Sequence, residues 1–243
     1  MKEMKFLYYL PAFGEGKMDI KGEILQHNLQ YIFNDIKQRF SICLNMYTND
    51  ELLKLRLSTL DYLEHIYVYE KKGVLTELFL TNPSNVHIDS FDYIFFCLDD
   101  VKIVNINFQR MIEIKEKYNI EILSPKVTNS THAFMSDYTN LTINNFLEVY
   151  CLLMKPANFK KYLSINTIEN KWTWGVDFLF GYYKMKVGIL NSYEVHHVLK
   201  ENSSNQSECT ELMIQYIRQV SHFSNHEDVW RAYKPLIETI VVD

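Results

Sequence analysis

In the N-terminal part of the chain, apolar residues fall alternately into continuous runs and into runs with helical spacing. The continuous runs are typical of strands covered on both faces, and they occupy Lys5–Pro11, Phe40–Tyr47 and Tyr93–Leu98. Between the first two, apolar side chains recur three and four positions apart from Ile20 to Arg39, which predicts an amphipathic helix. Strands that alternate with helices predict right-handed βαβ units and a mostly parallel sheet.

The same criteria predict the remaining elements. Short strands are expected at Ile66–Tyr69, Glu121–Ser124 and Val187–Leu190, and a further apolar run lies at Phe146–Met154. Helices are expected from Glu51 onward after a cap at Asp50, and at Val74–Leu80, Asn107–Lys117, Pro156–Tyr162, Cys209–Val220 and Asp228–Thr239. The segment Lys126–Asn140 is polar and predicts a loop. We therefore expect one α/β domain over residues 1–200, followed by a helical extension over residues 201–243 that packs on it.

Composition and charge narrow the class of protein. The 243-residue chain is 47% hydrophobic, which allows one large core, and its net charge of −5 without a basic stretch argues against nucleic-acid binding. The 4 cysteines form no C-x-x-C pair, so we expect buried thiols in a reducing compartment. Neither a membrane-spanning run nor a signal peptide is recognisable. These features favour a cytoplasmic protein and are compatible with peripheral attachment to a membrane.

The strand Tyr93–Leu98 ends in two adjacent carboxylates, Asp99 and Asp100. Ligands of open α/β sheets bind beyond the carboxyl ends of the strands. Adjacent carboxylates repel each other unless a cation lies beside them, and hard cations such as Mg²⁺ and Mn²⁺ take oxygen ligands and bridge to phosphate. The segment therefore suggests a metal–diphosphate site. The alternative is a strand whose polar end simply meets solvent.

A second candidate is the segment Trp172–Asp177, in which Trp174 and Gly175 precede the carboxylate of Asp177. A carboxylate held in a fixed, partly dry position can act as a general base toward a hydroxyl. Aromatic rings beside it would suit the apolar face of a sugar. In the alternative interpretation, the tryptophans are core residues and Asp177 caps a helix over Phe178–Lys184.

A third candidate follows the strand Val187–Leu190, where His196 and His197 are adjacent. A neutral imidazole can complete the shell of a Mn²⁺ that carboxylates hold. Because side chains alternate along a strand, only one of the two histidines can face such a site. The chain contains no G-x-S-x-G, P-loop or G-x-G-x-x-G motif, so triad hydrolases, P-loop NTPases and Rossmann dehydrogenases lose support.

Taken in order, these features resemble the metal-dependent glycosyltransferases of the GT-A fold, and in particular a group of small, poorly characterised GT-A-like proteins. The resemblance covers residues 5–200 and rests on segments 91–100, 146–156, 174–177 and 188–197. The family's acidic motif is Asp-x-Asp or three acids in a row, and Leu98 stands where the first of three would be. The resemblance implies a GT-A-like sheet flanked by helices, Mn²⁺ or Mg²⁺ as cofactor, and a nucleotide sugar, with UDP-sugars favoured, as donor.

The resemblance also assigns roles to single residues. Asp100 and His197 match the metal ligands, with His196 as the alternative histidine and Asp99 assisting on the donor side. Asp177 matches the carboxylate that faces the acceptor hydroxyl. Trp174 and Gly175 would line the acceptor side, and the residues implied near the nucleotide are Pro11, Ala12, Phe13, Tyr47 and, toward the diphosphate, Lys72.

The implied activity is transfer of a sugar to a hydroxyl of a glycan, a glycolipid or another acceptor, with inversion slightly favoured over retention. Two alternatives stay open. A catalytically silent GT-A-like protein that binds a nucleotide or a glycan is motivated by Leu98 in place of an acid. A nucleotidyltransferase shares the metal–carboxylate logic, but no glycine-rich loop with a basic residue follows the first strand.

Overall fold

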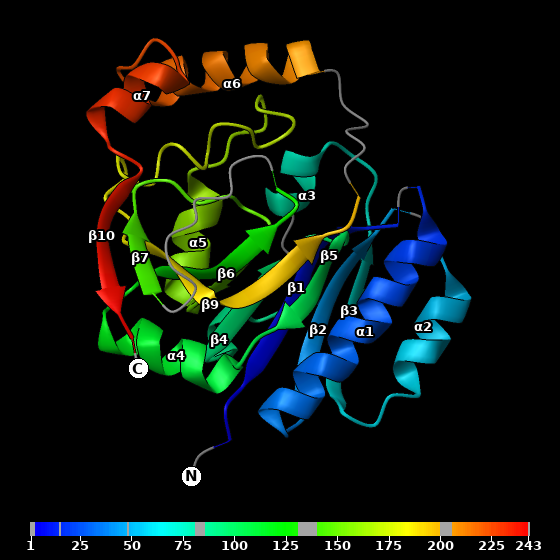
Figure 1. Cartoon of the computed structure of the whole chain (residues 1–243). Coiled ribbons are helices and arrows are strands. Elements are labelled where there is room, and N and C mark those ends of the chain that lie inside the picture. Colours follow the sequence, from blue (N-terminus) through cyan, green and yellow to red (C-terminus); the bar gives the residue numbers. More distant parts are fainter. Residues whose placement is uncertain are drawn as a thin grey trace.

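A computed structural model describes residues 3–14, 16–47, 49–80, 86–130, 140–199 and 206–242. Within these residues, helices cover both faces of a 10-stranded mixed sheet with the strand order β10-β7-β9-β6-β8-β4-β1-β2-β3, and β5 pairs with β9 (Figure 1). The fold is α/β, as the alternation of strands and helices predicts. None of the described helices combines the length and the apolar character needed to cross a membrane.

The elements have the following bounds. The strands are β1 (Phe6–Phe13), β2 (Phe40–Met46), β3 (Leu63–Glu70), β4 (Tyr93–Cys97), β5 (Val101–Asn105), β6 (Ile122–Thr128), β7 (Asn140–Asn144), β8 (Cys151–Met154), β9 (Val187–His197) and β10 (Leu236–Val241). The helices are α1 (Met18–Ile36), α2 (Glu51–Ser58), α3 (Leu75–Leu80), α4 (Phe108–Lys117), α5 (Pro156–Ser164), α6 (Gln206–Val220) and α7 (His226–Ala232), with a 3₁₀ turn at Ile88–Ser90.

The sheet has a parallel half and a mixed half. Strands β3, β2, β1 and β4 are parallel neighbours, as the βαβ pattern predicts. Beyond β4 the expectation of a mostly parallel sheet is too simple, because β8, β7, β5 and β10 pair in antiparallel fashion and only β6 and β9 pair in parallel. The parallel half is built from strands joined by helices, whereas β4 and β5, and β7 and β8, follow each other without a helix between them.

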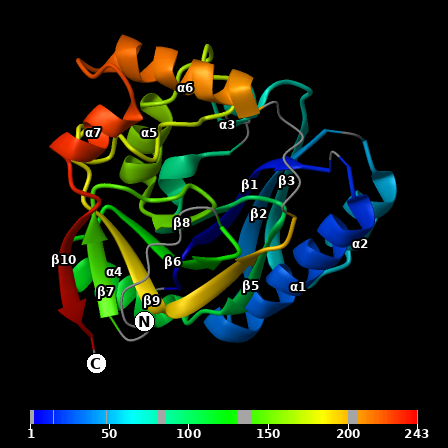
Figure 2. The same ribbon diagram turned by 45° about the horizontal axis from the view of Figure 1, so that its top comes forward.

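Two hydrophobic cores lie on opposite faces of the sheet. Alternate residues of β1 point into the two cores. Tyr8 belongs to the core that includes residues of α1, α2 and α4, and Tyr9 belongs to the core that includes residues of α3, α5, α6 and α7. Figures 1 and 2 show α1 and α2 on the side away from α6 and α7. Burial on both faces explains why the strands read as continuous apolar runs, because every side chain leaves water.

Several predicted boundaries are wrong. Strand β6 continues to Thr128 and β7 begins at Asn140, so the ends of the predicted loop Lys126–Asn140 are strands, while its middle lies outside the described residues. Residues 178–184 form turns rather than a helix. Gly175, just before this segment, and Lys184, at its end, have positive φ values of 92° and 53°, which an α-helix does not contain. The helix predicted to reach Thr239 ends at Ala232, and β10 then joins the sheet beside β7.

A buried side-chain amide holds β5, the antiparallel partner of β9, in place. The side chain of Asn28 on α1 is fully buried, and its Nδ2 donates to the Val101 carbonyl at 2.8 Å while its Oδ1 accepts from the Ile103 amide at 2.9 Å. Both of those residues belong to β5, which pairs with β9. Asn28 therefore satisfies backbone groups that a buried strand cannot leave unpaired, and it holds β5 directly after Asp100.

Candidate functional site

The candidate residues converge because the strands that carry them end at one edge of the sheet. Strand β8 is antiparallel to both β4 and β6, so β4 and β6 run in the same direction, and β9 is parallel to β6. Asp99 and Asp100 follow β4, and His197 ends β9. The carboxyl ends of parallel strands are where ligands of such sheets bind.

Asp100 and His197 contact each other directly. Strand β5 begins at Val101, which pairs with His197, and this register brings the His197 Nε2 to 3.1 Å from the Asp100 Oδ2. The neighbouring His196 turns the other way, and its Nδ1 lies 3.0 Å from the Thr128 hydroxyl. The structure thus places one histidine beside the acidic pair, as side-chain alternation along β9 requires.

The Asp100 carboxylate stabilises the protonated form of His197. Burial alone lowers the pKa of His197, but its hydrogen bond to Asp100 and the Asp100 charge raise that pKa above its usual value overall. The side chains of His197 and Asp100 are 12% and 21% exposed. The other carboxylate oxygen of Asp100, Oδ1, is buried and has no hydrogen-bond partner within the described residues.

The donor set fits a metal that is shared with a ligand. Among the described residues there is no group of three or more His, Cys, Asp or Glu side chains that could hold a metal by itself. Asp100 and His197 supply one carboxylate and one imidazole, and the unpartnered Asp100 Oδ1 is available for a further interaction. Mn²⁺ and Mg²⁺ that act on nucleotides are bound by one or two protein carboxylates, with phosphate oxygens and water completing the shell.

Asp99 is engaged elsewhere. Its Oδ2 accepts from the Lys21 ammonium at 2.9 Å and from the Gly14 amide at 3.1 Å, and the side chains of Lys21 and Asp99 are each 12% exposed. Burial raises the pKa of Asp99 to about 6, although Lys21 opposes that rise. The contacts tie the end of β4 to the turn after β1, where Gly14 has a φ of 100°. Asp99 therefore shapes the turn on the predicted donor side.

Replacing Lys21 by methionine should lower the free energy of unfolding by about 2 kcal/mol, because it leaves the buried Asp99 carboxylate without its cation. Chemical denaturation of the wild type and the variant measures this. The matched comparison is the same change in an Asp99→Asn background, where most of the loss should disappear. Equal losses in both backgrounds would show that the ion pair does not stabilise the turn.

The turn before Asp177 is built around Gly175. Gly175 has a φ of 92°, and a Cβ at this position would lie 2.7 Å from the Met213 Cγ on α6. Trp174 is half-buried against the core beneath α6, and its carbonyl accepts from the Asn170 Nδ2 at 2.8 Å. Only glycine meets both the backbone and the packing requirement here. No helix follows, so the interpretation of Asp177 as a helix cap is not realised.

Asp177 is a carboxylate in a dry environment. Its Oδ1 is buried without a hydrogen-bond partner in the part of the chain that the structure describes. Burial, and then the charge of Glu148, raise the pKa of Asp177 to about 7, while the amides of Gly175, Asp177 and Phe178 partly oppose this. A carboxylate with such a pKa is suited to accept a proton near neutral pH.

The segment before β8 contributes residues that the sequence interpretation missed. Leu147 donates its amide to the Asp177 carbonyl at 3.4 Å, and the Leu98 amide donates to the Tyr150 carbonyl at 3.0 Å. The Tyr150 ring lies 4.7 Å from the His197 ring, centroid to centroid. Glu148 is 9% exposed. The available signal was a glutamate and a tyrosine interrupting an apolar run just before a strand.

The residues predicted near the nucleotide lie at the same edge but on neighbouring strands. Pro11, Ala12 and Phe13 end β1 and are buried, so only their backbone can meet a ligand without rearrangement. The Tyr47 amide donates to the Phe13 carbonyl at 3.0 Å. Exposed Lys72 follows β3, the third strand along from β4. The structure thus joins Tyr47 to the end of β1 and places Lys72 toward the sheet margin.

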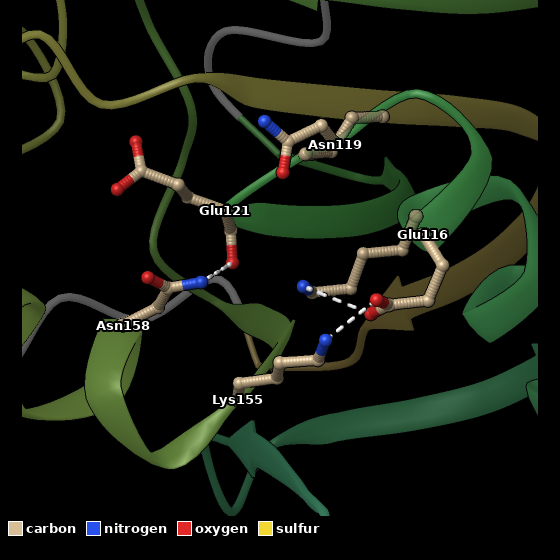
Figure 3. A pocket seen from close by; sticks show the side chains of 7 residues that line it. Glu116, Asn119, Glu121, Lys155 and Asn158 are labelled. Carbon is tan, nitrogen blue, oxygen red and sulfur yellow. Dashed lines mark hydrogen bonds and ion pairs between the residues drawn. The ribbon is translucent and has the colours of Figure 1, made fainter.

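A cavity of about 310 Å³ lies at the opposite edge, between the end of α4 and the starts of β6 and α5 (Figure 3). Its charged side chains have partners: Lys155 Nζ lies 2.5 Å from Glu116 Oε2, and Glu121 pairs at 2.9 Å with Lys161, which lies outside the lining. The Asn158 amide donates to the Glu121 carbonyl at 3.0 Å. We assign this cavity a structural role because its charges are already compensated.

Comparison with solved structures identifies the fold. The chain superposes on S. aureus TarS 1–349 in complex with UDP-GlcNAc with a TM-score of 0.60 at 11% identity, over 93% of this chain and 69% of that one. For GalNAc-T7 with UDP, GalNAc and Mn²⁺ the TM-score is 0.61 at 10% identity, over 89% and 48%. For the longer S. aureus TarS chain it is 0.56 at 12% identity, over 92% and 45%.

These similarities show a GT-A-like fold, which is shared with nucleotide-sugar glycosyltransferases. The chain spans less than half of the GalNAc-T7 chain and of the longer TarS chain, at 48% and 45%. No protein-family profile matches the sequence, and no curated protein matches it.

Proposed function

We propose that this protein is a divalent-metal-dependent glycosyltransferase that moves a sugar from a nucleotide sugar, with UDP-sugars favoured, to a hydroxyl acceptor. The observation that carries this is the Asp100–His197 contact at the carboxyl edge of a GT-A-like sheet. An unpartnered Asp100 oxygen and a high-pKa carboxylate, Asp177, support it. The GalNAc-T7 structure, which has a similar fold, contains UDP and Mn²⁺, and this also supports the proposal.

The reaction forms one bond and breaks another at the sugar C1. The bond from C1 to the diphosphate oxygen breaks, and the acceptor oxygen forms the new bond to C1. The proton of the acceptor hydroxyl goes to Asp177, whose pKa of about 7 leaves it able to accept that proton. Asp100 and His197 would hold a divalent cation, which would supply positive charge for the departing diphosphate. Attack from the acceptor side opposite the diphosphate would invert the sugar, which we favour.

A silent nucleotide- or glycan-binding protein is the second candidate. The observation in its favour is Leu98 at the position of a first acid, together with Asp99 held by Lys21. Such a protein would bind the donor without turnover. The two candidates share the Asp100–His197 site and differ only in whether the sugar is released, to water or to an acceptor.

Titration calorimetry with UDP, with and without Mn²⁺, tests the site. We expect UDP to bind about tenfold or more tightly with Mn²⁺, because diphosphate oxygens would complete the metal shell that two protein side chains leave open. Metal-independent or absent UDP binding would contradict the proposal. Incubation with UDP-sugars and release of UDP then separates the transferase from the silent protein.

The setting of the reaction is also a proposal. All four cysteines, Cys43, Cys97, Cys151 and Cys209, are free and buried, as a reducing compartment such as the cytoplasm permits. We propose a glycan or glycolipid acceptor, reached at a membrane surface if it is a lipid. The net charge of −5 supports no nucleic-acid partner.

A further inference from the structure

Tyr150 lies between the two parts of the site that the proposed function uses. Its ring packs on His197 at 4.7 Å, and its carbonyl is bonded to the Leu98 amide next to the acidic pair. Three residues earlier, the Leu147 amide is bonded to the Asp177 carbonyl. The segment from Leu147 to Tyr150 therefore bridges from the Asp177 side of the site to the Asp100 side.

The polar groups around Tyr150 are incompletely paired. Asp100 Oδ1 and Asp177 Oδ1 are buried acceptors with no partner in the described residues. Tyr150 is half-buried, and the charges of Glu148, Asp100 and Asp177 act on its hydroxyl. Buried acceptors that the protein leaves unpaired are satisfied by a ligand or by water.

The charges around the Tyr150 hydroxyl favour one class of ligand group. A phosphate would be repelled by the carboxylates of Glu148 and Asp177, whose charges act on the hydroxyl. A sugar hydroxyl both donates and accepts, so it can donate to a carboxylate and accept from a phenol. A phenol is protonated at neutral pH and so is available as the donor.

We propose that the Tyr150 hydroxyl donates a hydrogen bond to a hydroxyl of the transferred sugar, which makes Tyr150 a substrate-contacting residue that distinguishes the sugar nucleotide from the nucleotide alone. This inference rests on the proposed function and deepens it. Tyr150 also orients the His197 imidazole through ring packing, and that role needs only the aromatic ring.

Calorimetry of Tyr150→Phe in the presence of Mn²⁺ separates the two roles, because phenylalanine keeps the ring and removes the hydroxyl. The probe is UDP-GlcNAc or UDP-glucose, chosen as the one whose sugar adds more affinity over UDP in the wild type. The variant should bind UDP with an affinity within about twofold of the wild type, and it should bind the chosen UDP-sugar about tenfold more weakly. The matched control is Tyr67→Phe on β3, a half-buried tyrosine away from the site, which should change neither affinity.

Three outcomes would overturn the inference. Tyr150→Phe could weaken UDP and the UDP-sugar equally, which would assign the hydroxyl to the nucleotide or to folding of the site. The variant could leave both affinities unchanged. The wild type could bind UDP as tightly as either UDP-sugar, which would contradict the proposed sugar contact without contradicting the Mn²⁺–UDP site. A wild type that binds none of these nucleotides contradicts the proposed function itself.

Discussion

Asp100→Ala should abolish the Mn²⁺-dependent gain in UDP affinity and reduce sugar transfer by about 10³-fold. The variant removes both the oxygen that contacts His197 and the buried oxygen that has no partner within the described residues. A divalent cation at a departing diphosphate supplies several kcal/mol of charge stabilisation, and a loss of about 4 kcal/mol corresponds to about 10³ in rate. Calorimetry with and without Mn²⁺, together with UDP-release assays, measures the two effects separately.

The matched control for this variant is Asp61→Ala. Asp61 is exposed and precedes β3 at the opposite edge of the sheet, so its removal should leave UDP binding, metal dependence and transfer unchanged. Thermal unfolding should show that Asp100→Ala remains folded, since a partly exposed ion pair contributes only about 1 kcal/mol. A folded Asp100→Ala protein that keeps its Mn²⁺-dependent UDP binding would remove Asp100 from the metal site.

The first half of the fold follows from local patterns. Strands β1, β2 and β4 are buried on both faces, so each gives a continuous apolar run, and α1 between them has a clear helical spacing. The C-terminal strand was missed for a different reason. Leu236, Ile237 and Ile240 fit helical spacing, whereas their strand conformation depends on pairing with β7, far away in sequence. Pro235 was the local signal that a helix should end before it.

The site was predictable in its parts and not in its assembly. The acidic strand end and the histidines are visible in the sequence, but their contact requires β5, a short strand directly after Asp100 that the pattern did not reveal. Lys21 carries no local signature of its role, and Tyr150 is marked only as a break in an apolar run. Lys21 reaches Asp99 because α1 packs beside β5, which begins two residues after Asp99, and Tyr150 reaches His197 because β8 lies beside β4. Such contacts are set by tertiary packing, which single-residue patterns do not encode.

Asp177→Asn should lower the rate of transfer by about 10²–10⁴-fold, the range typical for loss of a general base. In the wild type, transfer should rise with pH up to about 7 and then level off, because Asp177 must be ionised to accept the proton of the acceptor hydroxyl. The variant should lose this limb of the pH profile while its affinity for UDP with Mn²⁺ stays within about twofold, since Asp100 and His197 are untouched. Rates measured between pH 5 and 9 at saturating donor test both statements.

The same substitution should stabilise the protein, with a pH dependence of known sign. Burial and then Glu148 raise the pKa of Asp177 to about 7 from 3.8. Below about pH 4 the carboxyl group is protonated in both states, so it does not affect stability. As the pH rises from about 4 to about 7, the carboxyl group ionises in the unfolded state first, and the free energy of unfolding falls until it levels off above about pH 7. Asp177→Asn should accordingly add about 1–3 kcal/mol to the free energy of unfolding at pH 8 and nothing at pH 3.5. Asp61→Asn, the exposed control, should add nothing at either pH. Two results would contradict this account. If Asp177→Asn is slower but no more stable at pH 8, Asp177 is well solvated, and its effect on the rate arises from positioning the acceptor. If Asp177→Asn is more stable but fully active, Asp177 takes no part in the chemistry.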